Sequence, residues 1–306
     1  MNAPEKSPLF SLSAWSAQQL GHIEQALSGW VACSPESPTP VSLVEAMRYA
    51  VLDGGKRLRP LLVLAACEAT RGNLQLALRP ACAVELIHAY SLVHDDMPCM
   101  DNDVLRRGKP TVHVQFGQAQ ALLTGDALQA LAFELLTPDD SSIDSATQAR
   151  LCRILAQAAG FQGMAGGQAI DLASVGLPLT SEQLHAMHRL KTGALLQASV
   201  MMGAACGTAS PTVLSALRDY GAAIGLAFQV VDDILDVTAD AATLGKTAGK
   251  DAAQDKPTFV SLMGLSASQA YAERLLAQAQ ASLQASGLEN TQALQALADM
   301  LVNRQH

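Results

Sequence analysis

The chain has 306 residues, of which 49% are hydrophobic and only 4% aromatic, and its formal net charge at pH 7 is −8. The acidic balance argues against nucleic acid as a partner, because phosphate backbones are bound by clustered Lys and Arg. Ala and Leu dominate the apolar residues, which favours packed helices over sheets, since strands draw on β-branched and aromatic side chains.

Helical spacing of apolar residues recurs along the chain, and no stretch sustains the alternation of several strands. The first helix is predicted around Leu20, Ile23 and Leu27, and the second over 41–52. Prolines in the loop 34–40 between them prevent helix. A glycine-rich turn at 53–60 leads into a helix over 61–70, whose first turn suits Pro60.

The next segment, 79–97, is nearly all apolar and predicts a helix buried on most sides. Further helices are predicted over 119–136, 146–173, 181–206 and 212–237, with two more ending at about Ser286 and Leu301. Thr180 with Gln183 forms a capping-box pattern, and Ser210 precedes a proline at a first helical position. Gly163 to Gly167 indicates close helix packing, and the irregular stretch 240–256 predicts a mobile loop.

Three features of the sequence predict the cellular compartment: the N-terminus, the cysteines and the longest uncharged stretch. The N-terminus lacks a basic flank followed by an apolar core, so no secretory signal is predicted. The six cysteines form no CxxC pair and are typical of buried thiols in a reducing compartment. The uncharged stretch 192–217 contains Gln197 and Pro211, which favours a buried helix and a turn over a membrane span. We predict one cytoplasmic domain over 1–306, with a flexible start at 1–12 and no membrane span.

Acidic residues cluster at the ends of two apolar segments. The first cluster holds Asp95, Asp96, Asp101 and Asp103, and the second holds Asp232, Asp233 and Asp236. Asp232 and Asp236 are four apart, so they share one helix face. Asp95 and Asp101 are six apart and would be out of phase on an ideal helix. Pro98 disfavours helix at Met97, so the chain can bend there and bring Asp101 beside Asp95.

Oxygen ligands without histidine pairs favour Mg²⁺ over zinc or copper, and Mg²⁺ commonly bridges carboxylates to substrate phosphates. Acidic groups at a helix C-terminus also oppose the helix dipole, and a bound cation would relieve that repulsion. The alternative is a solvated acidic helix end, which is less compatible with two clusters that both follow strongly apolar helices.

Basic residues are needed to cover the remaining phosphate oxygens. The candidates are Lys56 and Arg59 in the glycine-rich turn, Arg106 and Arg107 after the first cluster, and Lys191, Lys246, Lys250 and Lys256. For the two adjacent arginines, ion pairing with Asp101 and Asp103 is the alternative. His88 equally suits a buried core histidine. His185 and His188 could form a metal pair, but without a third ligand nearby we favour an exposed helix face.

Three motifs together resemble those of the trans-isoprenyl diphosphate synthases. They are Asp95-Asp96-x-x-x-x-Asp101 with Arg106-Arg107-Gly108, Asp232-Asp233-x-x-Asp236 after Phe228-Gln229, and Gly54-Gly55-Lys56-Arg57-x-Arg59-Pro60. The resemblance runs from about Val41 to Lys256 and beyond. It implies an all-α prenyl-synthase bundle with a deep central apolar cavity, usually a homodimer.

The resemblance also implies the reaction. Isopentenyl diphosphate would be joined head-to-tail to dimethylallyl and geranyl diphosphate to give (2E,6E)-farnesyl diphosphate, by ionisation, condensation and elimination. The implied cofactor is Mg²⁺, as three ions, with Mn²⁺ as a possible substitute.

Roles for single residues follow from the resemblance as well. The implied catalytic residues are Asp95, Asp101, Lys191 and Asp232, and the implied metal ligands are Asp95, Asp96, Asp101, Asp232 and Asp236. Arg106, Lys191, Thr192, Gln229, Lys246 and Lys256 would hold the allylic diphosphate. Lys56, Arg59, His88 and Arg107 would hold isopentenyl diphosphate.

Tyr90 and Ser91 occupy the positions that help to form the floor under the growing chain in this family. An aromatic residue at 90, with the insertion that contains Pro98, is similar to bacterial farnesyl diphosphate synthases. Geranyl and geranylgeranyl diphosphate remain open as products, and Tyr90 could instead be ordinary core packing. Val104 departs from the family pattern, where another acidic residue is frequent, and leaves the core motif intact.

Two other activities share parts of this pattern. A terpene cyclase shares the fold but lacks a second diphosphate site, so Lys56, Arg59 and Arg107 count against it. A non-catalytic synthase partner subunit usually loses one aspartate motif, and this chain keeps both.

Overall fold

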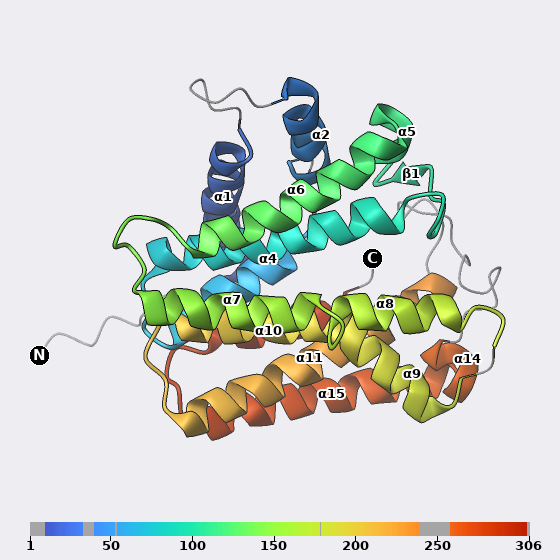
Figure 1. The fold of residues 1–306 in the computed structure, drawn as a ribbon. Coiled ribbons are helices and arrows are strands. Elements are labelled where there is room, and N and C mark those ends of the chain that lie inside the picture. Colours follow the sequence, from blue (N-terminus) through green and yellow to red (C-terminus); the bar gives the residue numbers. More distant parts are fainter. Residues whose placement is uncertain (1–9, 33–39, 53, 178, 239–257, 305–306) are drawn as a thin grey trace, which may run out of the picture.

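The computed structural model describes residues 10–32, 40–52, 54–177, 179–238 and 258–304, and this part of the chain is almost wholly helical (Figure 1). The helices are α1 (Leu12–Trp30), α2 (Val41–Val51), α3 (Leu58–Ala69), α4 (Leu74–Asp95), α5 (Val112–Phe116), α6 (Gln118–Leu136), α7 (Ser145–Ala159), α8 (Met164–Ala173), α9 (Ser181–His188), the π-helix η1 (Arg189–Gly193), α10 (Ala194–Ala205), α11 (Pro211–Thr238), α14 (Phe259–Met263), α15 (Leu265–Ser286) and α16 (Gln292–Val302). The strands in the described ranges are β1 (Leu105–Arg106) and β2 (Lys109–Pro110), a short antiparallel hairpin. The all-α prediction is confirmed.

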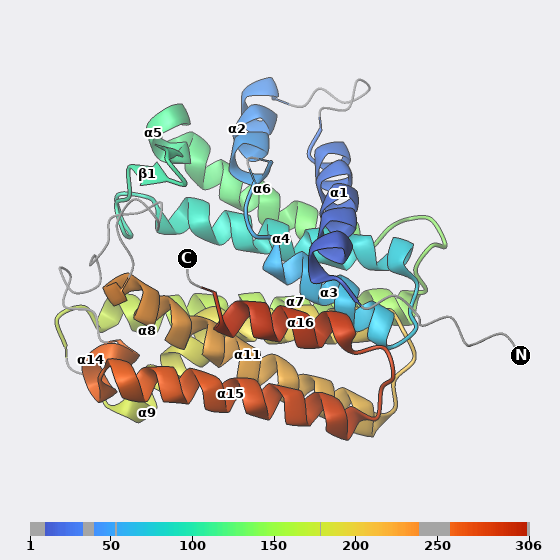
Figure 2. The same cartoon turned by 180° about the vertical axis from the view of Figure 1, so that it is seen from behind.

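The helices pack as a succession of neighbours around a large apolar core, and a smaller apolar cluster surrounds Val93. α4 packs against α6 on one side and α3 on the other, α3 packs on α10, α10 on α11, and α11 on α15 (Figure 1, Figure 2). The core consists mainly of aliphatic residues, and Tyr220 and Phe259 are its largest fully buried side chains. Within the described part, α4 alone is long and apolar enough to cross a membrane, and 61% of its most apolar window is buried inside the protein.

Glycines allow some helices to approach backbone to backbone. A Cβ added to Gly203 of α10 would lie 2.1 Å from the carbonyl oxygen of Val63 in α3, and one on Gly167 of α8 would lie 2.1 Å from the backbone nitrogen of Lys191. Because backbone atoms cannot rotate away as a flexible side chain can, only glycine fits these contacts. The close packing predicted for the stretch from Gly163 to Gly167 is confirmed at Gly167.

Gly167→Ala is expected to lower the free energy of unfolding by about 1–3 kcal/mol, because the added methyl group overlaps the backbone at Lys191. Gly21→Ala is the matched control: an added Cβ in this exposed part of α1 meets nothing within 4 Å. That variant should be stabilised by about 0.5–1 kcal/mol through helix propensity. Urea unfolding of both proteins measures the difference, and equal stability changes would contradict the close approach of α8 to η1.

The long periodic helices begin and end near the predicted residues, with three exceptions. The helix predicted over 146–173 is wrong: it divides into α7 and α8, because Gly160 adopts an extended conformation and Gly163 caps the next helix. The predicted segment 181–206 contains the π-helix η1 between α9 and α10. α4 begins at Leu74, earlier than predicted, because the Asn73 side chain accepts hydrogen bonds from the backbone N–H groups of Gln75 and Leu76.

Local capping predictions are confirmed at two helices. Thr180 and Gln183 form the reciprocal capping box of α9, and Ser210 Oγ accepts a hydrogen bond from the N–H of Val213 at the start of α11. The hairpin, α5 and α14 were missed because such short elements carry no periodic signal. Residues 34–39 of the predicted loop 34–40, the predicted loop 240–256, and residues 1–9 of the expected flexible start lie outside the described residues.

Candidate active site

A cavity of about 520 Å³ lies between the C-terminal half of α4, α8, η1 and α11. It receives most of the candidate residues from the sequence: Arg59, His88, Tyr90, Ser91, Asp95, Arg106, Arg107, Lys191, Thr192 and Asp232. The rest of the lining is largely apolar, with Leu92, Met100, Met164, Leu172 and Phe228 among the contributors. Two elements far apart in sequence thus bring an aspartate each to one apolar cavity.

The first aspartate cluster folds back on itself after α4 ends at Asp95. The N–H of Asp101 donates to the carbonyl oxygen of Asp95 at 2.8 Å, and the N–H of Asp103 donates to that of Asp96 at 3.1 Å. Asn102 takes a left-handed conformation, with φ of 51°, in this turn. The predicted bend at Pro98 is confirmed, and it places Asp101 beside Asp95.

The two adjacent aspartates have different surroundings. Asp96 is 3% exposed and accepts hydrogen bonds from Arg106, including one of 2.8 Å from Nε. Burial raises the pKa of Asp95 to about 6, and Asp101 adds to this effect while Lys191 opposes it. The negative charge of Asp95 at the cavity wall is therefore only partly balanced by its neighbours, which favours binding of a cation there.

In the second cluster, the three aspartates also differ in their surroundings. Asp232 lines the cavity and is ion-paired with Arg304, whose guanidinium lies 4.3 Å from the centroid of the Phe228 ring. Asp233 is 2% exposed and Asp236 is 8% exposed. Arg304 was missed from the sequence because 72 residues separate it from Asp232.

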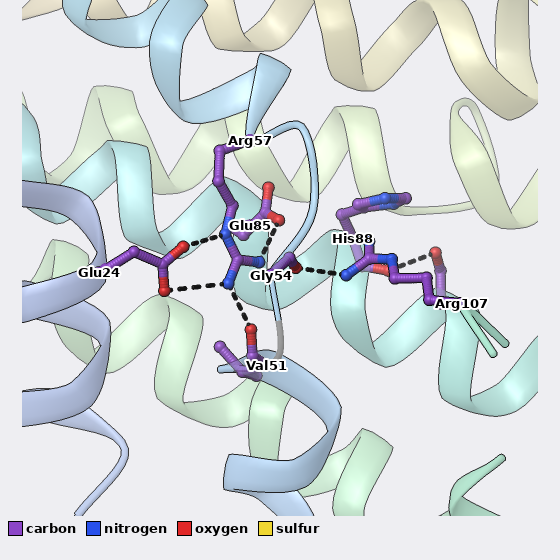
Figure 3. Close-up of polar contacts among 8 residues, drawn as sticks. Glu24, Val51, Gly54, Arg57, Glu85, His88 and Arg107 are labelled. Carbon is purple, nitrogen blue, oxygen red and sulfur yellow. Dashed lines mark hydrogen bonds and ion pairs between the residues drawn. The ribbon is translucent and has the colours of Figure 1, made fainter. Parts of the chain in front are cut away.

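The basic wall centres on His88 and the arginines around it. Arg107 donates a hydrogen bond to the carbonyl oxygen of Gly54, which ties the hairpin end to the glycine-rich turn (Figure 3). Nε of Arg59 is buried, and among the described residues it has no hydrogen-bond partner. Burial lowers the pKa of His88 well below its usual value, and the nearby Arg59 and Arg107 lower it further. His88 is therefore neutral at pH 7, in a surrounding suited to an anion.

Arg57 anchors this wall, and no local pattern in the sequence marks it for that role. Its guanidinium donates to Glu24 of α1 at 2.7 Å, to Glu85 of α4 at 2.8 Å and to the Val51 carbonyl oxygen at 2.6 Å (Figure 3). Arg57 is 3% exposed and has a left-handed backbone, with φ of 45°. Because Arg57 lies between Lys56 and Arg59 in the chain, the three contacts fix the turn that carries both candidate phosphate ligands.

The carboxylates of the site can be compared with the ligands that Mg²⁺ usually has in proteins. Within the described ranges, no three His, Cys, Asp or Glu side chains lie close enough together to hold a metal ion by themselves. Asp95 lies beside Asp101 on one wall, and Asp232 belongs to another. Mg²⁺ is usually held by one or two carboxylates and completes its shell with water and substrate phosphates. The residues therefore fit Mg²⁺ bound together with a phosphorylated ligand, rather than in a closed protein cage.

Comparison with known proteins gives the family. Residues 40–297 match the polyprenyl synthetase family. The chain belongs to this family. A Sinorhizobium fredii protein named "Probable farnesyl diphosphate synthase" is 51% identical over 269 residues, covering 87% of this chain and 80% of that protein. Geranylgeranyl pyrophosphate synthase 4 of Arabidopsis thaliana is 47% identical over 270 residues, covering 87% of this chain and 72% of that protein.

A solved structure shows the corresponding fold. Helicobacter pylori geranyltransferase, crystallised with magnesium and isoprenyl diphosphate, matches with a TM-score of 0.85 and 35% identity, covering 98% of this chain and 100% of that one. The similarity includes α4 and α11, the helices that carry the two aspartate clusters. It confirms the prenyl-synthase bundle expected from the sequence.

Some candidates lie at the edge of the cavity or outside the described residues. Lys56 is largely exposed, but partial desolvation, followed by the charge of Arg304, lowers its pKa while Asp232 raises it, so it lies near that ion pair. Gln229 accepts a hydrogen bond from the Thr192 hydroxyl at 3.1 Å. Lys246, Lys250 and Lys256 fall outside the described residues.

The polyprenyl synthetase cavity also contains a wall that the sequence did not predict. Met164, Ala165, Gln168, Ala169 and Leu172 of α8 line it. Both side-chain polar atoms of Gln168 are buried without a hydrogen-bond partner among the described residues. In the same region, Lys191 forms an ion pair of 2.5 Å with Asp171. The glycine-rich start of α8 was the available signal, and it indicated only packing.

The exposed face predicted for His185 and His188 is wrong. Both rings pack against Phe259, at centroid distances of 4.8 and 5.3 Å, and His185 Nε2 lies 3.0 Å from the Tyr271 hydroxyl. His188 is 6% exposed, and neither of its ring nitrogens has a hydrogen-bond partner in the described part of the chain. The reason is that α9 packs on α14, an element that the sequence did not predict.

His188→Phe is expected to reduce the loss of stability on acidification. Burial lowers the pKa of His188 from 6.5 to about 3 in the folded protein. Between these values the unfolded chain binds a proton that the folded chain does not, so stability falls by up to about 1.4 kcal/mol per pH unit as pH drops. Urea unfolding of wild type and variant at pH 7.5 and pH 5 measures this slope. Parallel pH dependences would contradict a buried neutral histidine.

Proposed function

We propose that this chain is a Mg²⁺-dependent prenyltransferase that condenses isopentenyl diphosphate with dimethylallyl and then geranyl diphosphate to give farnesyl diphosphate. The observation that carries the proposal is the single apolar cavity onto which aspartates from both motifs and a group of basic residues converge. Membership of the polyprenyl synthetase family supports the same reaction class.

The proposed residue roles divide the cavity into two substrate sites. Asp95, Asp101 and Asp232, supported by Asp96 and Asp236, would hold Mg²⁺, with three ions as the family number. Arg106, Lys191, Thr192 and Gln229, with Lys246 and Lys256 from outside the described residues, would hold the allylic substrate. Lys56, Arg59, His88 and Arg107 would hold isopentenyl diphosphate.

When bound, Mg²⁺ would neutralise the negative charge of the diphosphate leaving group. The chain's own residues must position both substrates and exclude water. The allylic C–O bond breaks to give a carbocation and diphosphate, the alkene of isopentenyl diphosphate forms the new C–C bond, and a proton then leaves to the released diphosphate. Leu92, Met164 and Phe228 line the cavity, and their apolar surfaces keep water from quenching the carbocation to an alcohol.

Tyr90 supports a farnesyl product because it lines the cavity on the same helix as Asp95. Its ring makes an edge contact with His94, at 5.7 Å between centroids. Geranylgeranyl diphosphate is the second candidate product, favoured by the similarity to the Arabidopsis thaliana protein. A terpene cyclase is disfavoured by the second group of basic residues around His88.

We further propose a cytoplasmic homodimer of single-domain chains. α5 and α6 carry the apolar side chains of Val114, Leu122 and Leu123, each about half exposed in the single chain. Exposed apolar side chains that gather on one part of a surface are typical of interfaces. The five cysteines in the described ranges are free thiols, which suits a reducing compartment.

The proposed function is tested by incubating the protein with isopentenyl diphosphate, Mg²⁺ and, separately, dimethylallyl, geranyl or farnesyl diphosphate. Products are then dephosphorylated and sized by chromatography. We expect a fifteen-carbon product from the first two starters and little extension of the third. A twenty-carbon product would favour geranylgeranyl synthesis, a cyclised hydrocarbon would favour a cyclase, and absence of product with every starter would contradict the proposal.

A further inference from the structure

A chain of hydrogen bonds runs from the cavity wall into the protein. Thr192 Oγ1 donates to Gln229 Oε1 at 3.1 Å, Gln229 Nε2 donates to Asp233 Oδ1 at 2.9 Å, and the backbone N–H of Phe259 donates to Asp233 Oδ2 at 2.7 Å. Thr192 lines the cavity, whereas Asp233 is 2% exposed. The chain links η1, α11 and the first residue of α14.

Asp233, the acceptor at the buried end, determines which group donates in each hydrogen bond of this chain. The two carboxylate oxygens of Asp233 accept from Gln229 Nε2 and from the Phe259 N–H, so the NH₂ group of Gln229 faces Asp233. The carbonyl oxygen of that amide then faces Thr192, and the Thr192 hydroxyl must donate its only proton to it. The oxygen lone pairs of Thr192 are thereby left to face the cavity, and they can stabilise positive charge there.

The second oxygen of Asp233 is fixed independently. It accepts the N–H of Phe259, whose side chain is fully buried and packs against His185 and His188. The carboxylate therefore cannot turn away from Gln229 without breaking the start of α14.

We propose that Asp233 is a positioning residue that sets the polarity of the Thr192 hydroxyl through the Gln229 amide. The inference rests on the proposed function, because it is the carbocation of prenyl transfer that the lone pairs of Thr192 would stabilise. Asp233 itself is buried and is not among the residues that line the cavity. It affects turnover only through Gln229 and Thr192. Substitutions at positions 233 and 229 can reverse, and then restore, the direction of the hydrogen bonds between these side chains.

Asp233→Asn reverses the polarity. The amide introduced at position 233 keeps its oxygen for the Phe259 N–H, so its NH₂ group faces Gln229, and the Gln229 amide must turn to present its own oxygen. The Gln229 NH₂ group then donates to Thr192, whose hydroxyl proton points to the cavity. We expect kcat to fall about 10- to 100-fold, with a much smaller change in KM, because the misdirected dipole opposes charge that develops only in the transition state.

The double variant Gln229→Glu with Asp233→Asn restores the polarity at unchanged net charge. The carboxylate introduced at position 229 accepts both from the NH₂ group introduced at position 233 and from the Thr192 hydroxyl. We expect kcat at least about 10-fold above that of Asp233→Asn, and above that of Gln229→Glu alone, which places two carboxylates side by side. If Asp233→Asn does not fold, the ordering of the double variant above Gln229→Glu is the decisive result.

The test measures kcat and KM with isopentenyl and geranyl diphosphate for wild type, both single variants and the double variant, with a melting temperature for each. The same set is made in a Thr192→Val background, where the differences in kcat between Asp233→Asn and the double variant should vanish. Equal kcat for wild type and Asp233→Asn, no rescue in the double variant, or a difference that persists in the Thr192→Val background would each overturn the inference. Failure of the proposed function would be distinct, since the wild type itself would then form no prenyl product.

Discussion

Asp95→Asn is expected to lower kcat for prenyl transfer about 100- to 1,000-fold while the fold is retained. Asp95 ends α4 at the cavity wall beside Asp101, where burial raises its pKa to about 6. A carboxylate in that position costs stability when no cation is bound, so its presence is explained by the ligand that it holds. Asparagine has the same shape but cannot supply the negative charge.

The metal-free variant should accordingly melt no lower than metal-free wild type, because the substitution removes a poorly solvated charge. Asp139→Asn, at an exposed loop position far from the cavity residues in sequence, is the matched control and should leave kcat unchanged. Radiometric assay with isopentenyl and geranyl diphosphate measures turnover, and calorimetry measures melting. Near-normal turnover of Asp95→Asn would exclude a metal role for this residue, and a large loss of melting temperature would indicate a structural one.

Tyr90→Ala is expected to change the main product from fifteen to twenty carbons. Tyr90 lies five residues before Asp95 on α4 and lines the cavity, and we propose that its ring stops the growing chain after two condensations. Removing the ring extends the apolar space in which one more isoprenoid unit can fit. Chromatography of the dephosphorylated products measures the shift.

Tyr90→Phe is the control because it keeps the ring and removes only the hydroxyl. It should still release farnesyl diphosphate. Ser91, whose Oγ donates to the His88 carbonyl oxygen at 2.9 Å, is the neighbouring floor candidate. If the product profile of Tyr90→Ala equals that of wild type, the floor lies elsewhere, for example on α8.

The parts of the site that could be predicted depend on short-range rules. The bend after Asp95 follows from Pro98, which acts on its immediate neighbour, and the all-α bundle follows from apolar periodicity. Both are confirmed. The glycine at 167 also marks close packing as predicted, although its partner, the backbone of Lys191, could not be named from the sequence.

The parts that could not be predicted depend on contacts between distant segments. Arg57 is held by Glu24 and Glu85, which lie 33 and 28 residues away, and nothing near Arg57 in the sequence marks it as buried. The break between α7 and α8 was missed because helical periodicity continues across it. The interior position of His188 depends on α14, which is too short to give a pattern.

The most direct test of metal binding is a calorimetric titration of the protein with Mg²⁺, alone and with a non-ionising allylic thiodiphosphate. We propose that aspartates of the two motifs hold the metal together with a diphosphate, because no group of three acidic, cysteine or histidine side chains in the described residues could hold it alone. We predict weak binding without the diphosphate, tight binding with it, and loss of the tight binding in both Asp95→Asn and Asp232→Asn. Equally tight binding of Mg²⁺ without the diphosphate, or tight binding that survives both substitutions, would contradict this claim.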